Sequence, residues 1–227
     1  MKPFFSFKAS ASGAALSIYD EIFSTHAAAF RTALDAVKGS TLTVEINSPG
    51  GDVFAGLAIY NMLKGSGKII NVNVAGIAAS AASVIAMAGT TISMPSNSFM
   101  MIHNPITGVY GNAADLRESA DVLDKIGAAL LAIYVSRTGM PADKMKELLA
   151  AETWLTADEA VSMKFATVVT DAIEARASFD MGRADLPAHV KAVFKPLSTP
   201  TPHAAVLAAV QPVITPSTLW AHHRRTK

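Results

Sequence analysis

Apolar residues follow two spacings that alternate along the chain. Where β-branched and apolar residues alternate with polar ones, the pattern predicts half-buried strands, and where apolar residues stand three and four apart it predicts helices. Strands are expected at 16–22, 41–47, 69–75, 91–94, 99–102 and 166–169. Helices are expected at 26–37, 53–64, 80–88, 112–137 and 141–150, and a capping-box pattern at Thr156 opens a short further helix. This order of elements indicates an α/β domain.

The strands at 41–47 and 69–75 enclose a helix, and the loops between them are short. A helical crossover of this kind favours a parallel pair with a right-handed connection. After the first strand, Ser48-Pro49-Gly50-Gly51 predicts a tight turn, because glycine alone is comfortable at positive φ. Such a turn exposes N–H groups at the start of a helix, where negative charge is stabilised, although a purely structural turn is the alternative interpretation.

One apolar run, from Val72 to Gly89, has about the length of a membrane span. Its first part is β-branched, and its later part is rich in alanine, serine and glycine. A buried strand that ends at Gly76, followed by a buried helix from Ser80, explains both halves. No membrane association is therefore expected.

The composition narrows the classes of function. Charged residues are only 16% of the chain, and 19 Lys and Arg balance 18 Asp and Glu, so there is no electrostatic basis for nucleic-acid binding. The chain has no cysteine, which excludes disulfides, thiolate metal sites and a cysteine nucleophile. No pair of histidines has metal-ligand spacing, so neither a metal nor another cofactor is expected.

The two ends of the chain differ from its middle. Lys8 interrupts the apolar residues near the N-terminus, so no secretory signal is expected and a cytoplasmic location is the default. From 195 to 217 proline, threonine and alanine dominate, which is poor material for a packed core. We expect one folded domain at 1–176 and a flexible tail at 177–227.

Ser80 and His103 are the candidate reactive side chains. Ser80 lies at a predicted strand-to-helix junction among residues too small to cover its hydroxyl, and His103 ends an apolar strand before Asn104-Pro105. A serine hydroxyl with an imidazole as its general base is a pairing used for nucleophilic catalysis. Taken singly, Ser80 is also explained as a helix N-cap, and His103 as a structural residue.

These motifs together resemble the Clp protease proteolytic subunit family, and more closely the Clp-related head-maturation proteases of phages and prophages. The similarity covers 16–169 in the runs INSPGGDVFAGLAIYNML, VAGIAASAASVIAMAG, SFMMIHNP and ETWLTADEAV. It implies a crotonase-like αβα sandwich with parallel βαβ units and a long protruding helix at 112–137, the segment with which family members join two rings. The site residues that it implies are Ser80 as nucleophile, His103 as general base, and Gly51 and Ala81 as N–H donors of an oxyanion hole.

The family's third catalytic residue, an aspartate, is expected after the short helix that opens at Thr156. Without gaps in the comparison, Thr167 occupies the position of this aspartate, and Asp171 follows a little further on. A threonine cannot stabilise an imidazolium as a carboxylate does. Asp171 is therefore the candidate third residue.

The resemblance implies a serine endopeptidase that forms ring-shaped homo-oligomers and cleaves capsid-assembly proteins of a phage or prophage. An AAA+ unfoldase partner stays open, because the short N-terminus does not resemble the axial gating loops of the housekeeping enzyme. The alternatives are a housekeeping Clp-type proteolytic subunit and a scaffold protein that keeps the fold without catalysis. An acyl-coenzyme-A hydratase or isomerase would leave Ser80 and His103 without a role, and a serine–lysine peptidase would make His103 dispensable.

Overall fold

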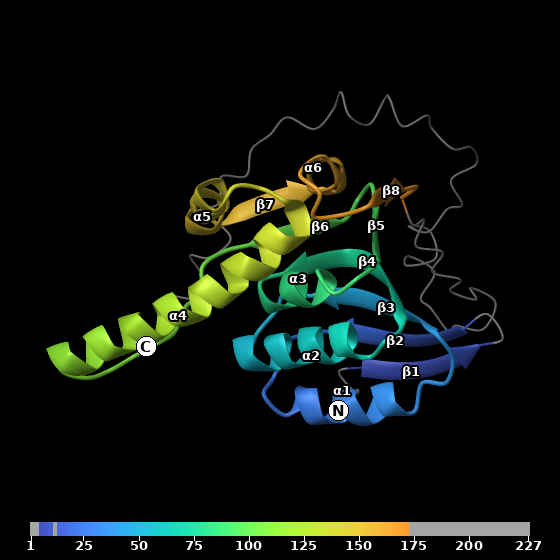
Figure 1. Cartoon of the computed structure of the whole chain (residues 1–227), viewed down its shortest axis with the longest axis horizontal. Coiled ribbons are helices and arrows are strands. Elements are labelled where there is room, and N and C mark those ends of the chain that lie inside the picture. Colours follow the sequence, from blue (N-terminus) through green and yellow to red (C-terminus); the bar gives the residue numbers. More distant parts are fainter. Residues whose placement is uncertain (1–4, 11–12, 173–227) are drawn as a thin grey trace, which may run out of the picture. The chain divides into compact units, whose positions relative to one another are not determined.

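The computed structural model describes residues 5–10 and 13–172, and the tail expected at 177–227 lies outside them. The described part combines strands and helices in an α/β arrangement, as the sequence predicts (Figure 1). They are β1 (Phe5–Ser10), β2 (Gly13–Tyr19), α1 (His26–Asp35), β3 (Thr41–Ser48), α2 (Val53–Gly65), β4 (Ile69–Ala79), α3 (Ala81–Ala86), β5 (Thr91–Pro95), β6 (Phe99–Ile102), α4 (Ala113–Thr138), α5 (Ala142–Ala150), β7 (Thr153–Thr156), α6 (Ala157–Ser162) and β8 (Val168–Thr170).

The strands form a mixed sheet in the order β1-β2-β3-β4-β5-β8. Strands β2 to β5 and β8 run parallel, whereas β1 is antiparallel to β2. Besides β3, the long strand β4 has two partners, β5 along Asn71–Asn73 and β6 along Ile77–Ala79. Strand β7 then pairs with β6 in the antiparallel sense. The sheet therefore divides along β4, and the branch formed by β6 and β7 carries the candidate site.

Apolar and polar side chains alternate along β2, β3 and β4, which gives this part of the sheet one apolar face. The strand residues buried on that face are Leu16, Ile18, Leu42, Val44, Ile46, Ile70, Val72 and Val74. They form one cluster with Phe30 of α1, Ile59 of α2 and the apolar residues of α3, and every residue of α3 is buried. Because the core closes over α3, the start of this helix is held rigidly beside the end of β4.

Most of the expected elements are confirmed, including the parallel crossover from β3 through α2 to β4. Several expectations need correction. The strand expected at 16–22 lies earlier, as β2 at Gly13–Tyr19, and β1 before it is not predicted. Strand β4 does not end at Gly76 but continues to Ala79, because its last residues pair with β6. The local pattern does not predict β7, and β8 begins later than expected, at Val168. For β4, β7 and β8 the boundary is set by a pairing partner far away in the chain, which local alternation cannot reveal.

The apolar run from Val72 to Gly89 forms most of β4 and all of α3, as expected. Within the described residues, no helix combines the length and the apolar character needed to cross a membrane. The longest described helix, α4, has 26 residues, begins with a capping box at Asn112 and ends before Gly139 at a φ of 69°. Figure 1 shows it extending past the end of the sheet.

Candidate active site

The pairing of β4 with β6 brings Ser80 and His103 together. Ala79 at the end of β4 pairs with Met101, and the N–H of Ser80 donates to the Met101 carbonyl at 2.9 Å. His103 directly follows β6. Because two neighbouring parallel strands end at the same edge of a sheet, both side chains emerge there. The Oγ atom of Ser80 lies 2.7 Å from Nε2 of His103, which is hydrogen-bonding distance.

The backbone of Ser80 has a conformation that few residues other than glycine adopt. Its φ is 53° and its ψ is −124°, at the junction between β4 and α3. Such a conformation costs on the order of 1–3 kcal/mol and persists only where the surrounding structure holds it, often at functional sites. The Ser80 side chain makes no capping hydrogen bond to α3. The interpretation of Ser80 as a simple helix N-cap is therefore not supported, and its hydroxyl is directed to His103 instead.

His103 has the protonation properties of a general base. Partial burial lowers the pKa of His103 below its ordinary value of 6.5, and the nearby Glu152 carboxylate opposes this shift by raising the pKa. Burial is the larger effect, so the imidazole is mostly neutral at pH 7. A neutral imidazole at this distance can accept the proton of the Ser80 hydroxyl.

A carboxylate that sequence reasoning missed, Glu152, lies beside His103. The antiparallel register ends where Ile102 pairs with Thr153, so His103 and Glu152 are the next residues outward, and the Glu152 carboxylate is close enough to raise the pKa of His103. Glu152 has a φ of 49°, and its Oε1 atom accepts a hydrogen bond from Nε1 of Trp154 at 3.3 Å. The backbone and the indole thus hold this carboxylate near the imidazole.

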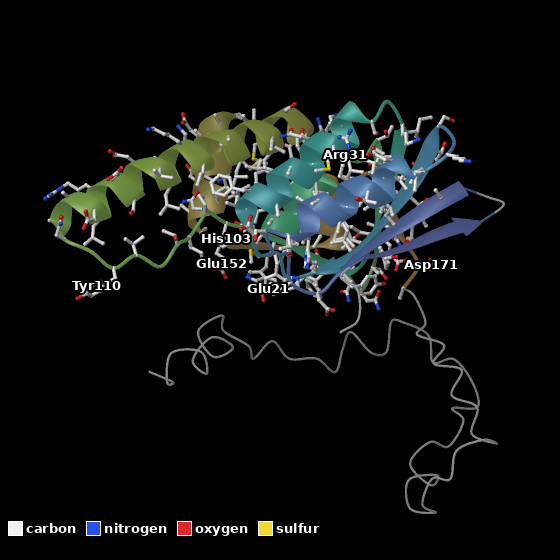
Figure 2. All side chains as sticks on the ribbon, turned by 90° about the horizontal axis from the view of Figure 1, so that it is seen from below. Glu21, Arg31, His103, Tyr110, Glu152 and Asp171 are labelled. Atoms are coloured by element: carbon white, nitrogen blue, oxygen red, sulfur yellow. The ribbon has the colours of Figure 1, made fainter. Side chains whose placement is uncertain are left out.

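The structure does not bring Asp171 to His103. Asp171 follows β8, which pairs with β5 on the other branch of the sheet, and Figure 2 shows it well away from His103. Thr167, which sequence comparison placed at the aspartate position, also belongs to that branch. Its Oγ1 atom accepts hydrogen bonds from the N–H of Ile92 at 2.9 Å and from Nη2 of Arg137 at 3.0 Å. Thr167 therefore has a structural role, and the carboxylate beside the imidazole is Glu152.

The glycine turn after β3 lies directly against Ser80. Gly50 has a φ of 95°, and a Cβ atom there would lie 2.8 Å from Cβ of Ser80 and 3.0 Å from N of Ala81. Gly51 has a φ of 144°, and a Cβ atom there would lie 2.1 Å from the carbonyl oxygen of Ile22. Both the backbone conformation and the lack of space therefore require glycine at these two positions.

Hydrogen bonds on either side hold this turn in place. Oγ of the fully buried Ser48 donates to the carbonyl of Asp20 at 2.6 Å and accepts from the N–H of Gly50 at 3.1 Å. Ile22 bonds to both neighbours of Gly51, because its N–H donates to the Gly50 carbonyl at 2.7 Å and its carbonyl accepts from the N–H of Asp52 at 2.8 Å. In this parallel bridge the N–H of Gly51 itself points away from Ile22. That N–H is thus left available on the opposite side of the turn.

Comparison with known proteins agrees with this geometry. Residues 13–172 match a family model described as Clp protease. The chain is 35% identical over 126 residues to an ATP-dependent Clp protease proteolytic subunit of Porphyromonas gingivalis, which covers 54% of this chain and 56% of that protein. It is 36% identical over 131 residues to the subunit of the same name in Bacteroides fragilis, covering 56% of this chain and 63% of that protein.

A third relative is matched over more of its own length. This is an ATP-dependent Clp protease proteolytic subunit 1 of Chlamydia caviae, which is 32% identical over 145 residues, covering 57% of this chain and 75% of that protein. The chain therefore spans somewhat more than half the length of the first relatives and three quarters of this one.

Proposed function

The chain belongs to the Clp protease family, and from this premise we propose that it is a serine peptidase in which Ser80 is the nucleophile. The observation that carries the proposal is the distance of 2.7 Å between Oγ of Ser80 and Nε2 of His103. Ser80 lies at a strained turn, and its hydroxyl makes no capping hydrogen bond to α3. A serine nucleophile needs a neutral base and a carboxylate near that base, and the proposal gives these roles to His103 and to Glu152, whose charge acts on the imidazole.

The geometry supports an acyl-enzyme mechanism. His103 takes the proton of the Ser80 hydroxyl through Nε2 as Oγ attacks the carbonyl carbon of a peptide bond. The imidazolium that forms is stabilised by the Glu152 carboxylate, and it then gives its proton to the leaving amine. Water, activated by the same imidazole, hydrolyses the acyl-enzyme and releases Ser80.

We assign the oxyanion hole to the backbone N–H groups of Gly51 and Ala81. The N–H of Ala81 belongs to the first turn of α3, where N–H groups have no acceptor inside the helix. The Gly50-Gly51 turn lies against this N–H, since Gly50 approaches N of Ala81 closely. Two convergent N–H donors next to the nucleophile are the arrangement that stabilises a tetrahedral oxyanion.

A fluorophosphonate probe, read by intact mass, tests the proposed nucleophile. We expect one adduct on the wild type, no adduct on Ser80→Ala and none on His103→Ala, because phosphonylation needs the activated hydroxyl. Ser66→Ala removes a serine at the end of α2, at the opposite end of β4 from Ser80, and serves as the control that keeps the adduct. A folded wild type that takes up no probe would favour the inactive scaffold, and an adduct that survives in Ser80→Ala would place the nucleophile elsewhere.

The pH dependence of kcat/KM tests the assignment of the base. His103 must be neutral to accept a proton, so activity rises with pH through the pKa of His103 in the free enzyme. Burial lowers this pKa, and the midpoint of the rise is therefore expected below pH 6.5. A midpoint well above that value, with a peptide ester or amide substrate, would show that His103 is not the titrating base.

We propose that the protein works as a homo-oligomer. Helix α4 and the segment before it expose apolar side chains that a monomer would leave in water, among them Ile106 and Leu116 at 80% and 49% exposure. The resemblance in sequence favours a ring in which α4 joins two halves. Sedimentation at protein concentrations spanning the micromolar range measures the state directly, and a monomer throughout would contradict this part of the proposal.

For the substrates, the phage-type motifs favour capsid-assembly polypeptides cleaved in the cytoplasm, whereas the names of the relatives favour a housekeeping subunit that works with an ATP-driven partner. The Ser80→Ala variant can separate the two. This variant binds substrates without cleaving them, so bound polypeptides can be identified after purification. If the substrates are capsid-assembly proteins, capsid or scaffold polypeptides should co-purify without ATP. If the protein is a housekeeping subunit, substrates should co-purify only when an AAA+ unfoldase is present.

A further inference from the structure

A buried chain of hydroxyl groups connects α4 to the turn that holds Ser80. Oγ of Ser83 donates to the carbonyl of Ser80 at 2.7 Å, and Oη of Tyr134 lies 2.7 Å from the same Oγ. Ser83 is fully buried, and Tyr134 is 1% exposed. The mechanism described above uses neither residue, although Ser83 bonds to the nucleophile's own carbonyl and Tyr134 bonds to Ser83.

The direction of these hydrogen bonds follows from the number of protons. A serine hydroxyl has one proton, and that of Ser83 is given to the Ser80 carbonyl. Tyr134 must therefore donate to Ser83. Burial raises the pKa of the Tyr134 hydroxyl far above its ordinary value, so it keeps its proton at every pH at which the enzyme works.

The Ser80 carbonyl is thus held by three donors. Besides Oγ of Ser83, it accepts the N–H of Ser83 at 3.0 Å and the N–H of Val84 at 3.3 Å. All three draw the oxygen into α3. In a trans peptide the N–H points opposite to the C=O, so the N–H of Ala81, which shares this peptide, points away from the helix and toward the Gly50 turn.

We propose that Tyr134 and Ser83 are positioning residues that hold the Ser80–Ala81 peptide so that its N–H serves the oxyanion hole. This inference rests on the proposed function, and it explains how a strained peptide keeps one orientation. Hydrogen bonds that follow one another in a chain, here from Tyr134 to Ser83 and from Ser83 to the Ser80 carbonyl, also polarise one another. The hydroxyl chain therefore makes the Ala81 N–H a better donor as well as orienting it.

Kinetics of Ser83→Ala, Tyr134→Phe and the double variant test the proposal. We expect each to lower kcat by about tenfold, less than the 100- to 1000-fold seen when an oxyanion donor is removed, because the two backbone bonds to the carbonyl remain. KM should stay the same, since neither side chain reaches the surface. The double variant should lose no more than either single variant, because Tyr134 acts only through Ser83.

Thermal unfolding separates positioning from mere stability. Ser83→Ala leaves the buried Tyr134 hydroxyl without its partner, so the midpoint of thermal unfolding should fall. The double variant removes both hydroxyl groups, so its midpoint should lie higher than that of Ser83→Ala, while its kcat should stay equally low. Ser98→Ala is the matched control, since Oγ of the buried Ser98 donates to the carbonyl of Pro95 at 2.8 Å in the same local pattern, at the opposite end of β6 from His103. Its midpoint should fall while its kcat stays within about twofold of the wild type.

Equal kcat values for wild type and the double variant would overturn the proposal, and so would a loss of kcat in Ser98→Ala as large as in Ser83→Ala. If the wild type neither takes up the fluorophosphonate nor turns over peptide, the proposed function fails. The positioning role of Ser83 and Tyr134 is then tested without kinetics, by comparing crystal structures of the wild type and Ser83→Ala. A Ser80–Ala81 peptide that rotates or splits into two orientations in Ser83→Ala then supports it, and an unchanged peptide refutes it.

Discussion

Replacing Ser80 with alanine is expected to lower kcat for a peptide substrate by about a million-fold, the loss that follows removal of a serine nucleophile acting with its base. The thermal midpoint should stay close to that of the wild type, because alanine keeps a Cβ atom at the same positive φ and leaves the backbone strain unchanged. Steady-state hydrolysis of a fluorogenic peptide measures kcat, and thermal unfolding measures the midpoint.

His103→Ala should fall to nearly the same residual rate, and the double variant should be no slower. The two residues act as one unit through the hydrogen bond of 2.7 Å, so their losses do not add. Additive losses would show that Ser80 and His103 contribute separately, and a Ser80→Ala variant with wild-type turnover would rule out the proposed mechanism altogether.

Replacing Glu152 with glutamine is expected to lower kcat by three to four orders of magnitude, about the loss seen when the carboxylate of a serine triad becomes an amide. The glutamine keeps the size of the side chain but cannot stabilise the imidazolium of His103. Because the carboxylate raises the pKa of His103, its removal should also move the acid limb of the pH profile to lower pH. Both effects are read from one series of kcat/KM measurements across pH.

Asp171→Asn is the matched control for this experiment. It removes the carboxylate that sequence comparison favoured, yet Asp171 follows β8 on the other branch of the sheet. Its rate and pH profile should equal those of the wild type. If Asp171→Asn is crippled and Glu152→Gln is not, the assignment of the third residue to Glu152 is wrong and the original expectation returns.

The difference between these two carboxylates shows why the third residue was hard to find. Ser80 and His103 stand in distinctive local surroundings, one among small residues at a strand end and the other between an apolar strand and a proline. Glu152 has no such surroundings. The only local signal is the short alternation in Thr153-Trp154-Leu155 that follows it, which would have suggested a strand and placed Glu152 at its start.

By itself the sequence determined the order of most strands and helices, the parallel crossover of β3 and β4, and Ser80 and His103 as the candidate reactive side chains. These features depend on hydrophobic periodicity, on glycine at the turn after β3 and on the small residues around Ser80. All of them act between residues close together in the chain, so a local pattern records them.

Only the tertiary structure decided which carboxylate faces His103, where β4 ends and what holds the Ser80 peptide. Glu152 is placed by the antiparallel pairing of β6 with β7, the end of β4 by its pairing with β6, and the Ser80 carbonyl by a hydroxyl that Tyr134 supports from α4. Each of these contacts joins segments more than a dozen residues apart or depends on one that does. Their free energy comes from burial and hydrogen bonding between distant parts of the chain. Such contacts do not change the local spacing of apolar and polar residues, so a local pattern cannot predict them.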